Sequence, residues 1–261
     1  MGRPHIEFIN ALDVAPRPLA DGPFEGASLR LLSEDGETGA YTAMLFCPAG
    51  WRADLSGFDR PVELFGLRGA IEVGGRPLGE GCYSHLHPTR DARPLVASPG
   101  GAHVLLMVED ATDERRSLPV HVIDTGTMRW QASLAPGLSV KWLRIDGETG
   151  DRSWVAASCA RKQENRAEVH PTIEECLMLR GDCLLGRHGE MTPGAYFWRP
   201  PYVPHGPLCT RNGAMYFFRT KGGDFDTTYE TVPGWEDLVR EYFAREPYLD
   251  LDLGEASGAP A

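Results

Sequence analysis

The sequence lacks the features that mark membrane and secreted proteins. It contains no run of about 18 consecutive apolar residues, so we expect no transmembrane helix. The opening segment MGRPHIEFINALDV lacks the apolar core that follows the basic head of a signal peptide. The six cysteines form no C-x-x-C pair, which favours buried thiols over disulfides. These absences predict a cytoplasmic protein.

Positive charge is also scarce. Lys and Arg total 26 against 37 Asp and Glu, which gives a formal net charge of −11 at pH 7. Nucleic acid and anionic membranes would repel such a chain, so we expect neither as a partner. A small-molecule substrate is the partner that remains. With 261 residues, of which 42% are hydrophobic, the chain can bury one large or two ordinary domains.

The pentapeptide DGETG occurs twice, at residues 35–39 and, 111 positions later, at residues 146–150. Asp-Gly and Thr-Gly supply the positive φ angles of hairpin turns, so both copies are predicted to be equivalent turns. Further matches at offsets of 111 or 112 are residues 28–32 with 139–143, 66–69 with 178–181, and 101–102 with 213–214. A register kept over such a length indicates an internal duplication.

The secondary structure is predicted to be almost entirely β. The 30 Gly and 21 Pro residues punctuate short apolar runs, a pattern typical of β sandwiches and barrels. One amphipathic helix is expected from Trp235 to Arg245, because its apolar residues recur every three or four positions. The predicted division is an N-terminal barrel at 1–118, a C-terminal barrel at 119–232, and a helix with a flexible acidic tail at 233–261.

Residues with metal-binding chemistry gather in the second copy. Glu168 and His170 are two positions apart, so on a strand their side chains share one face. Glu174 can join them after a bend at Pro171. His205 follows in a proline-rich turn, whose restricted backbone would hold the imidazole in place.

These residues resemble the two motifs of the cupin superfamily, approximately H-x-H-x(3,4)-E-x(6)-G and G-x(5)-P-x-G-x(2)-H. The second copy reads E-x-H-x(3)-E-x(6)-G from Glu168 to Gly181 and G-x(5)-P-x(4)-H from Gly194 to His205. Glu168 replaces the usual first histidine, and Tyr202 replaces the inner glycine. With the duplication, the chain resembles a bicupin, two tandem jelly-roll barrels, and RPPYVPHGP is similar to ChrR-like cupins.

The resemblance implies one divalent transition metal in the second barrel. His170, Glu174 and His205 would be its ligands, with positions open for substrate or oxygen. Glu168 would be a fourth ligand, or a carboxylate beside the ligands that orients one of them or moves a proton; Tyr202 is a second candidate for handling protons. Fe²⁺ is favoured, while Mn²⁺, Ni²⁺ and Zn²⁺ stay open.

The first copy does not repeat this ligand set. At an offset of 112, Ser56, Phe58 and Val62 stand in place of Glu168, His170 and Glu174, and Arg93 or Ala92 stands in place of His205. None of these replaces the ligand concerned, so the first barrel is predicted to have lost its site. The pair His85 and His87 falls on another strand and is predicted to have a packing or surface role.

Arg180, Tyr196 and Trp198, together with Tyr202, are the candidates for contact with substrate, although aromatic residues in a small barrel also fill its core. Glu175 directly follows Glu174 on the predicted strand, so its side chain should point to the opposite face, away from the cavity. The favoured function is an iron(II) dioxygenase acting on a small oxygenated metabolite. A manganese or zinc hydrolase or isomerase, and a non-catalytic metal or metabolite sensor, remain alternatives. A homodimer formed through an exposed sheet edge is compatible with this architecture.

Overall fold

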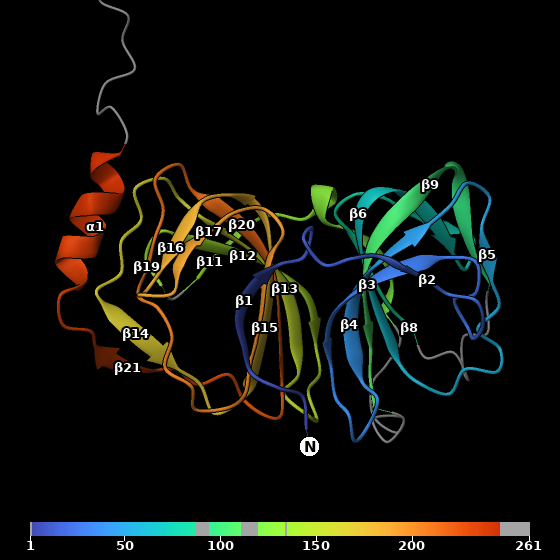
Figure 1. The fold of residues 1–261 in the computed structure, drawn as a ribbon, viewed down its shortest axis with the longest axis horizontal. Helices are drawn as coiled ribbons and strands as arrows, with labels where there is room; N and C mark the ends of the chain where they lie inside the picture. The colour runs from blue at the N-terminus through green and yellow to red at the C-terminus, as the bar shows by residue number, and fades with distance from the viewer. Residues whose placement is uncertain (1, 87–93, 111–119, 134, 246–261) are drawn as a thin grey trace, which may run out of the picture.

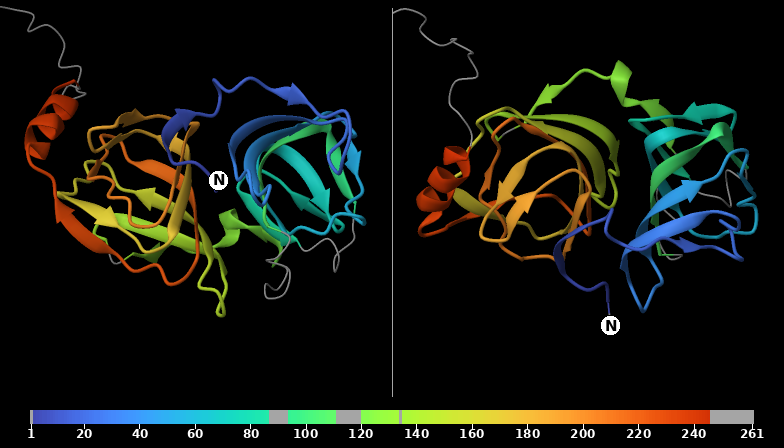
Figure 2. Two further views of the ribbon diagram at one scale, coloured as in Figure 1. Left: turned by 60° about the horizontal axis from the view of Figure 1, so that its bottom comes forward. Right: turned by 45° about the horizontal axis from the view of Figure 1, so that its top comes forward.

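The computed structural model describes residues 2–86, 94–110, 120–133 and 135–245. Figures 1 and 2 show two jelly-roll barrels side by side, with one helix against the outer face of the C-terminal barrel. The predicted all-β class, with tandem barrels and a short C-terminal helix, is confirmed. Residues 246–261, predicted to be a flexible acidic tail, lie outside the described residues.

A nine-stranded sheet forms the N-terminal barrel, with the main order β10-β8-β6-β9-β4-β3-β2 and with β5 and β7 at its margins. All its pairings are antiparallel. Its strands are β2 (Arg17–Pro18), β3 (Ser28–Glu34), β4 (Tyr41–Cys47), β5 (Arg52–Ala53), β6 (Val62–Val73), β7 (Arg76–Leu78), β8 (Cys82–Leu86), β9 (Leu95–Val108) and β10 (Val120–Asp124). A 3₁₀ turn, η2 (Thr125–Thr127), follows β10.

The C-terminal barrel has one large sheet and two small ones. The large sheet has the order β1-β18-β15-β20-β13-β12-β11, and the small sheets are β14-β21 and β17-β16-β19. The large sheet contains β1 (Ile6–Asn10), β11 (Gln131–Ala132), β12 (Leu138–Ile145), β13 (Arg152–Ser158), β15 (Ile173–Gly181), β18 (Ala195–Arg199) and β20 (Ala214–Lys221). The small sheets contain β14 (Arg166–Val169), β16 (Cys183–Leu185), β17 (Gly189–Met191), β19 (Leu208–Cys209) and β21 (Thr228–Thr231).

Two strands cross from one half of the chain to the other. The N-terminal strand β1 pairs with β18 of the C-terminal barrel, where Ile6 lies opposite Trp198. Strand β10 pairs with β8 of the N-terminal barrel. Each barrel therefore includes one strand from the other side of the predicted boundary between residues 118 and 119. The boundary stays a prediction of where the first copy ends and the second copy begins in the sequence.

Both DGETG segments form the turn of a hairpin, between β3 and β4 and between β12 and β13. In the first, Asp35 Oδ1 accepts hydrogen bonds from the backbone N–H groups of Glu37 and Thr38 at 2.9 and 3.1 Å. Asp146 repeats this pattern in the second turn, at 3.0 and 3.1 Å. Only the second glycine of each copy has a positive φ, at 68° and 77°. The structural equivalence predicted from the repeat is confirmed.

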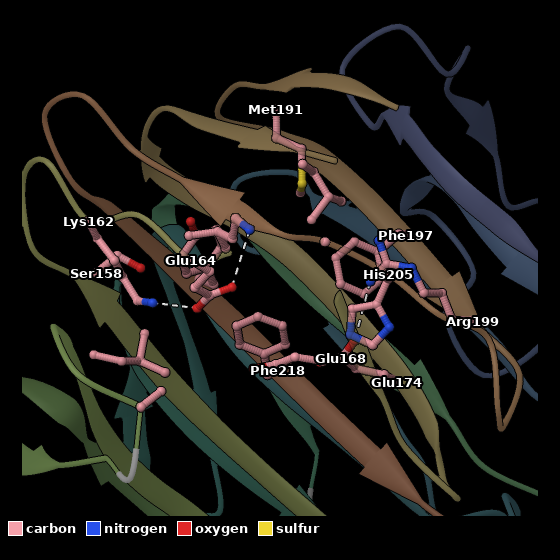
Figure 3. Close-up of a pocket in the computed structure, with 16 residues that line it drawn as sticks. Ser158, Lys162, Glu164, Glu168, Glu174, Met191, Phe197, Arg199, His205 and Phe218 are labelled. Atoms are coloured by element: carbon pink, nitrogen blue, oxygen red, sulfur yellow. Dashed lines mark hydrogen bonds and ion pairs between the residues drawn. The ribbon is translucent and has the colours of Figure 1, made fainter. Parts of the chain in front are cut away.

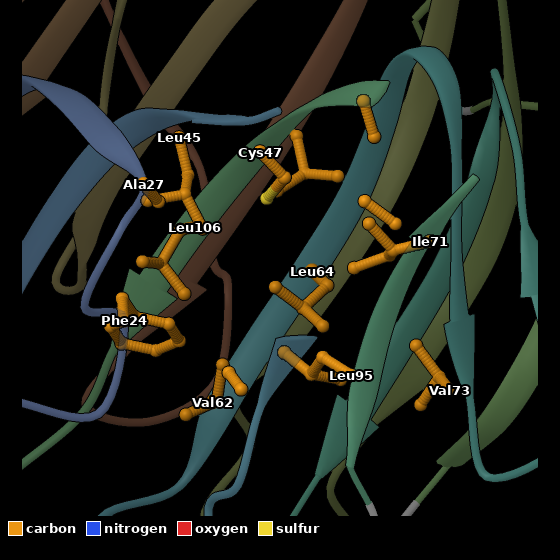
Figure 4. Close-up of a cluster of buried hydrophobic side chains, with 14 of the residues drawn as sticks. Phe24, Ala27, Leu45, Cys47, Val62, Leu64, Ile71, Val73, Leu95 and Leu106 are labelled. Carbon is orange, nitrogen blue, oxygen red and sulfur yellow. The ribbon is translucent and has the colours of Figure 1, made fainter. Parts of the chain in front are cut away.

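The two barrels differ in how their interiors are filled. The N-terminal barrel encloses a continuous cluster of aliphatic side chains, shown in Figure 4, in which Val62, Leu64 and Leu106 are fully buried. Val62 is the residue that stands in place of Glu174, so apolar packing occupies the position of the ligand. The C-terminal barrel contains a smaller cluster around Trp154, Phe197 and Tyr216, and it keeps a cavity beside that cluster.

Charged side chains are buried where the barrels meet. Arg219 is only 2% exposed; its Nε donates to Glu175 Oε2 at 2.8 Å, and its Nη1 donates to Glu109. Glu63, 1% exposed, lies 3.6 Å from Arg219 Nη1. Burial alone would raise the pKa of Glu63 and of Glu175, but nearby positive charges together outweigh it and lower both, with Arg219 the largest and Arg144 or Arg3 adding to it. These carboxylates therefore stay ionised because Arg219 and the neighbouring arginines neutralise them.

The predicted C-terminal helix is confirmed as α1 (Trp235–Ala244). Its buried residues Trp235, Val239 and Tyr242 pack against the C-terminal barrel, with Cys209 in the same cluster. Trp235 Nε1 also donates to the backbone oxygen of Glu164 at 2.7 Å, which ties the helix to the segment before β14. Across the described ranges, no helix has the length and apolar character needed to cross a membrane.

Candidate metal centre

Backbone pairing brings the predicted metal-binding residues together. Glu168 lies on β14, and His205 lies in the turn after β18. The backbone N–H of Glu168 donates to the His205 carbonyl at 2.8 Å, and the His205 N–H donates back to the Glu168 carbonyl at 3.0 Å. This bridge fixes the proline-rich turn against the strand, so the imidazole of His205 reaches the residues that follow β14.

Glu168, His170 and His205 each offer a ligand atom, and these atoms all lie within 4.8 Å of one another. His170 and His205 are 3% and 8% exposed, and their ring centroids are 5.0 Å apart. His170 Nε2 lies 3.6 Å from Glu168 Oε2. In the part of the chain that the structure describes, this is the single group of three such residues able to hold a metal ion.

Hydrogen bonds orient both imidazoles. His170 Nδ1 lies 3.1 Å from the carbonyl oxygen of Asp226, and the ring stacks on Phe225 with centroids 4.1 Å apart. His205 Nδ1 lies 3.0 Å from the Val203 carbonyl oxygen. A carbonyl oxygen accepts a hydrogen bond from Nδ1–H, so each ring, when neutral, presents the lone pair of Nε2 to the centre. This is the tautomer that a metal ligand requires.

The Nε2 atom of His170 supplies the test of whether a metal fits. It is buried and has no hydrogen-bond partner. A buried polar atom without a partner is costly in a folded protein, and metal coordination would satisfy it. The chemistry of the group agrees, since imidazole nitrogen and carboxylate oxygen suit Fe, Mn and Zn.

Glu174, the remaining predicted ligand, borders the group. Its Oε2 lies 3.1 Å from His205 Nε2 and accepts a hydrogen bond from Arg199 Nη1 at 3.2 Å. Burial would raise the pKa of Glu174, but the charges of His205, His170 and Arg199 outweigh it and lower the pKa to about 2. For His170, burial would lower the pKa, but the carboxylates of Glu168 and Glu174 raise it. Glu174 is therefore ionised at neutral pH.

A residue from the opposite end of the chain supports Glu174. Glu7, on the crossing strand β1, accepts hydrogen bonds from Arg199 Nη2 at 2.6 Å and from Arg199 Nε at 3.2 Å. Arg199 is 1% exposed and thus lies between two carboxylates, Glu7 and Glu174. The guanidinium can hold Glu174 in place because Glu7 fixes its far edge.

We expect Glu7→Gln to weaken metal binding about tenfold, the lower end of what the loss of a group that orients a metal ligand costs. Without the Glu7 charge, Arg199 is held less firmly, and so is the Glu174 carboxylate that it positions beside His205 Nε2. Competition with a chelator of known affinity would measure the effect. The matched control is His5→Ala, because His5 also contacts Glu7, at 3.1 Å, but does not touch Arg199 in the described contacts. Equal metal affinity in wild type and Glu7→Gln would contradict this role.

A cavity of about 80 Å³ adjoins the centre. Its lining is drawn in Figure 3 and consists of Ala135, Leu138, Ser158, Lys162, Glu164, Glu168, Glu174, Leu185, Met191, Phe197, Arg199, His205, Gly206, Leu208, Tyr216 and Phe218. Lys162 and Glu164 form an ion pair, and because they belong to no recognisable motif, sequence pattern did not predict them. Burial raises the pKa of Glu164, and the nearby charge of Glu168 adds to this.

The two predicted aromatic substrate contacts lie away from the cavity lining. Tyr196 and Trp198 pack between the barrels, and the Tyr196 hydroxyl binds Glu175 and Ser33. Their neighbours Phe197 and Arg199 line the cavity instead. Every residue of β18 is buried, so the strand has no solvent-exposed face to indicate which side is inward.

Two further predicted residues also lie away from the cavity lining. Arg180 is exposed near the end of β15. Tyr202 is 71% exposed and has a φ of 63°, in the left-handed region, while its backbone N–H donates to the His170 carbonyl at 2.7 Å. Tyr202 therefore supports the backbone next to the centre, while its side chain lies outside the cavity lining. Glu175, as expected, points away from the cavity and toward Arg219.

In the first barrel, the described residues opposite His170 and Glu174 are apolar. Phe58 packs against the apolar cluster, and Val62 belongs to it. His85 is buried at 1% exposure, opposite Glu63 on the neighbouring strand, as expected for a packing role. His87, Ala92 and Arg93 lie outside the described residues.

Solved structures confirm the fold. A protein of Nostoc punctiforme described as a candidate dioxygenase superposes with a TM-score of 0.73 at 20% identity, covering 88% of this chain and 92% of its own. Bacillus subtilis oxalate decarboxylase gives 0.58 at 12% identity, covering 98% and 86%. The salicylate 1,2-dioxygenase of Pseudoaminobacter salicylatoxidans gives 0.53 at 12% identity, covering 73% of each chain. No curated protein matches the sequence.

The chain has the fold of these solved structures, and its motif spacing resembles that of the cupin superfamily. Residues 119–222 match the family model of the ChrR Cupin-like domain. The match covers the part of the chain that carries Glu168, His170, Glu174 and His205, and the similarity noted in the sequence to ChrR-like cupins is thereby confirmed.

Proposed function

We propose that this protein is an enzyme that holds one Fe²⁺ ion at Glu168, His170 and His205 and acts as a dioxygenase on a small oxygenated metabolite. The observation that carries the proposal is the buried Nε2 of His170, which lacks a hydrogen-bond partner and faces the Glu168 carboxylate beside a cavity. The similar fold of two proteins described as dioxygenases or candidate dioxygenases supports the reaction class.

When bound, the metal would supply Lewis acidity and oxygen activation. The protein's own residues would fix the ligands and control protons. The Asp226 and Val203 carbonyls hold the imidazole tautomers, and Arg199 keeps the Glu174 carboxylate beside His205. The side chain of Glu168 is 27% exposed, so it can exchange protons with solvent while facing the centre. Apolar walls around Phe197 and Phe218 keep bulk water away from the bound substrate.

The two carboxylates support a second candidate, a manganese- or zinc-dependent hydrolase or isomerase. Glu168 and Glu174 both border the two histidines, and a second oxygen ligand makes the set harder and better suited to Mn²⁺. A solved structure of similar fold, the Bacillus subtilis oxalate decarboxylase, contains Mn(II) centres. In this reading the metal would polarise a carbonyl group or activate a bound water molecule.

Oxygen consumption separates the two candidates. Protein purified without oxygen and loaded with Fe²⁺, Mn²⁺ or Zn²⁺ would be mixed with panels of diketones, catechols and 2-hydroxy acids in an oxygen electrode. We expect oxygen uptake only by the Fe²⁺-loaded protein, and none by the His170→Ala variant. Turnover without oxygen uptake in the Mn²⁺ or Zn²⁺ form would support the second candidate. Metal retention with no turnover of any compound would contradict both and favour a sensor.

A further inference from the structure

The cavity beside the centre has polar and apolar regions that are separated in space. Glu168, Glu174 and His205 lie at one side of it, and Lys162 and Glu164 lie at the other. Figure 3 shows Phe218 and Phe197 between these groups, with Met191 above them. A ligand whose head reaches the centre would therefore place its remaining atoms against aromatic and aliphatic carbon.

Size limits what those remaining atoms can be. The cavity measures about 80 Å³. An apolar protein cavity of about 150 Å³ holds benzene, which corresponds to roughly 25 Å³ for each ring carbon. By that measure this cavity encloses roughly three or four carbon atoms, so a six-membered aromatic ring does not fit without movement of the walls.

Charge limits the head of the ligand. The two cations that line the cavity are already paired, Lys162 with Glu164, and Arg199 with Glu174 and Glu7. Neither is left to bind a second carboxylate of a ligand. With Glu164, Glu168 and Glu174 on the lining, a dianion would also meet repulsion. The head should carry one negative charge at most and bind through oxygen atoms at the centre.

We propose that the site takes a compact aliphatic oxygen chelator with no more than one negative charge and an apolar body of three or four carbons. This inference rests on the proposed metal-dependent function. It selects short aliphatic 2-oxo or 2-hydroxy monocarboxylates and compounds of the same shape. It excludes catechols, hydroxybenzoates and dicarboxylates as good ligands.

Three 2-oxo acids with the same head and different bodies test the size limit: glyoxylate, 3-methyl-2-oxobutanoate and phenylglyoxylate. Binding to the anaerobic Fe²⁺-loaded protein would be measured by titration calorimetry, and metal content by elemental analysis of the same samples. We expect 3-methyl-2-oxobutanoate to bind at least tenfold more tightly than glyoxylate, because its isopropyl group is buried. It should also bind at least tenfold more tightly than phenylglyoxylate, whose ring is too large.

Met191 supplies a test on the protein side, since it lines the cavity and is 1% exposed. Met191→Ala enlarges the cavity and should reverse the order, so that phenylglyoxylate becomes the tighter ligand. Met191→Leu, which nearly conserves volume, should keep the wild-type order. Unchanged metal content in both variants would show that folding and the centre are intact.

The outcomes distinguish this inference from the function on which it rests. Wild-type protein that holds Fe²⁺ but binds the three acids equally, or prefers phenylglyoxylate, would overturn the size limit and leave the metal centre standing. Oxalate binding as tightly as 3-methyl-2-oxobutanoate would overturn the charge limit. Wild-type protein that fails to retain any of Fe²⁺, Mn²⁺ or Zn²⁺ would overturn the proposed function, and this inference with it.

Discussion

Replacing His205 or His170 with alanine is expected to reduce metal content to below one tenth of the wild-type value. Each substitution removes one of only two nitrogen ligands, and the acidic residues that remain cannot fix a transition metal in a partly exposed site. Elemental analysis after dialysis against a weak chelator would measure the loss.

His188→Ala is the matched control, because His188 lies on the same barrel, 3.6 Å from Glu7, but outside the group of ligand atoms. It should retain wild-type metal content. If both His170→Ala and His205→Ala keep their metal, the proposed centre is in the wrong place.

Arg219→Met is expected to lower the free energy of unfolding by about 3–5 kcal/mol, the cost of removing one partner of a buried ion pair. Methionine is the residue that the other copy carries at the equivalent position, Met107, where it is buried. It leaves Glu63, Glu109 and Glu175 buried without their shared cation. Urea unfolding followed by tryptophan fluorescence would measure the change.

Two further variants test whether the loss of stability in Arg219→Met comes from the unpaired buried charges. Arg240→Met removes an ion pair on α1 in which Arg240 is 76% exposed, and it should change stability by no more than about 0.5 kcal/mol. Adding Glu109→Gln to Arg219→Met should recover part of the lost stability, because one buried charge fewer is left without a partner. A double variant less stable than Arg219→Met would show that Arg219 acts through packing instead.

The sequence predicted the parts of this structure that follow from local pattern. The repeated pentapeptide predicted equivalent hairpin turns, and the periodic apolar residues of 235–245 predicted the helix. The spacing of Glu168, His170 and His205 predicted a group that the fold does bring within 4.8 Å. Each of these signals depends on residues that are close in sequence or on a motif of fixed spacing.

Long-range contacts and doubly buried strands could not be predicted in this way. Glu7 meets Arg199 across 192 positions of sequence, through a strand that crosses between barrels. On β18 the inward pair, Phe197 and Arg199, and the outward pair, Tyr196 and Trp198, are all buried, so hydrophobicity carries no information about orientation. On such a strand, orientation is better inferred by counting alternate residues from one whose side chain is known to point inward.

The exchange of β1 and β10 bears on the history of the chain. The two exchanges follow nearly the same offset as the sequence repeat, since β1 pairs with β18 opposite Trp198 just as β10 pairs with β8 opposite His85, 113 positions earlier. Two identical single-barrel chains that swapped their first strands would make a closed dimer with this connectivity. After fusion of the two genes, one copy could lose its metal ligands and fill its interior with aliphatic side chains. The other copy would keep its ligands. The present protein has the arrangement expected of a strand-swapped dimer joined into one chain.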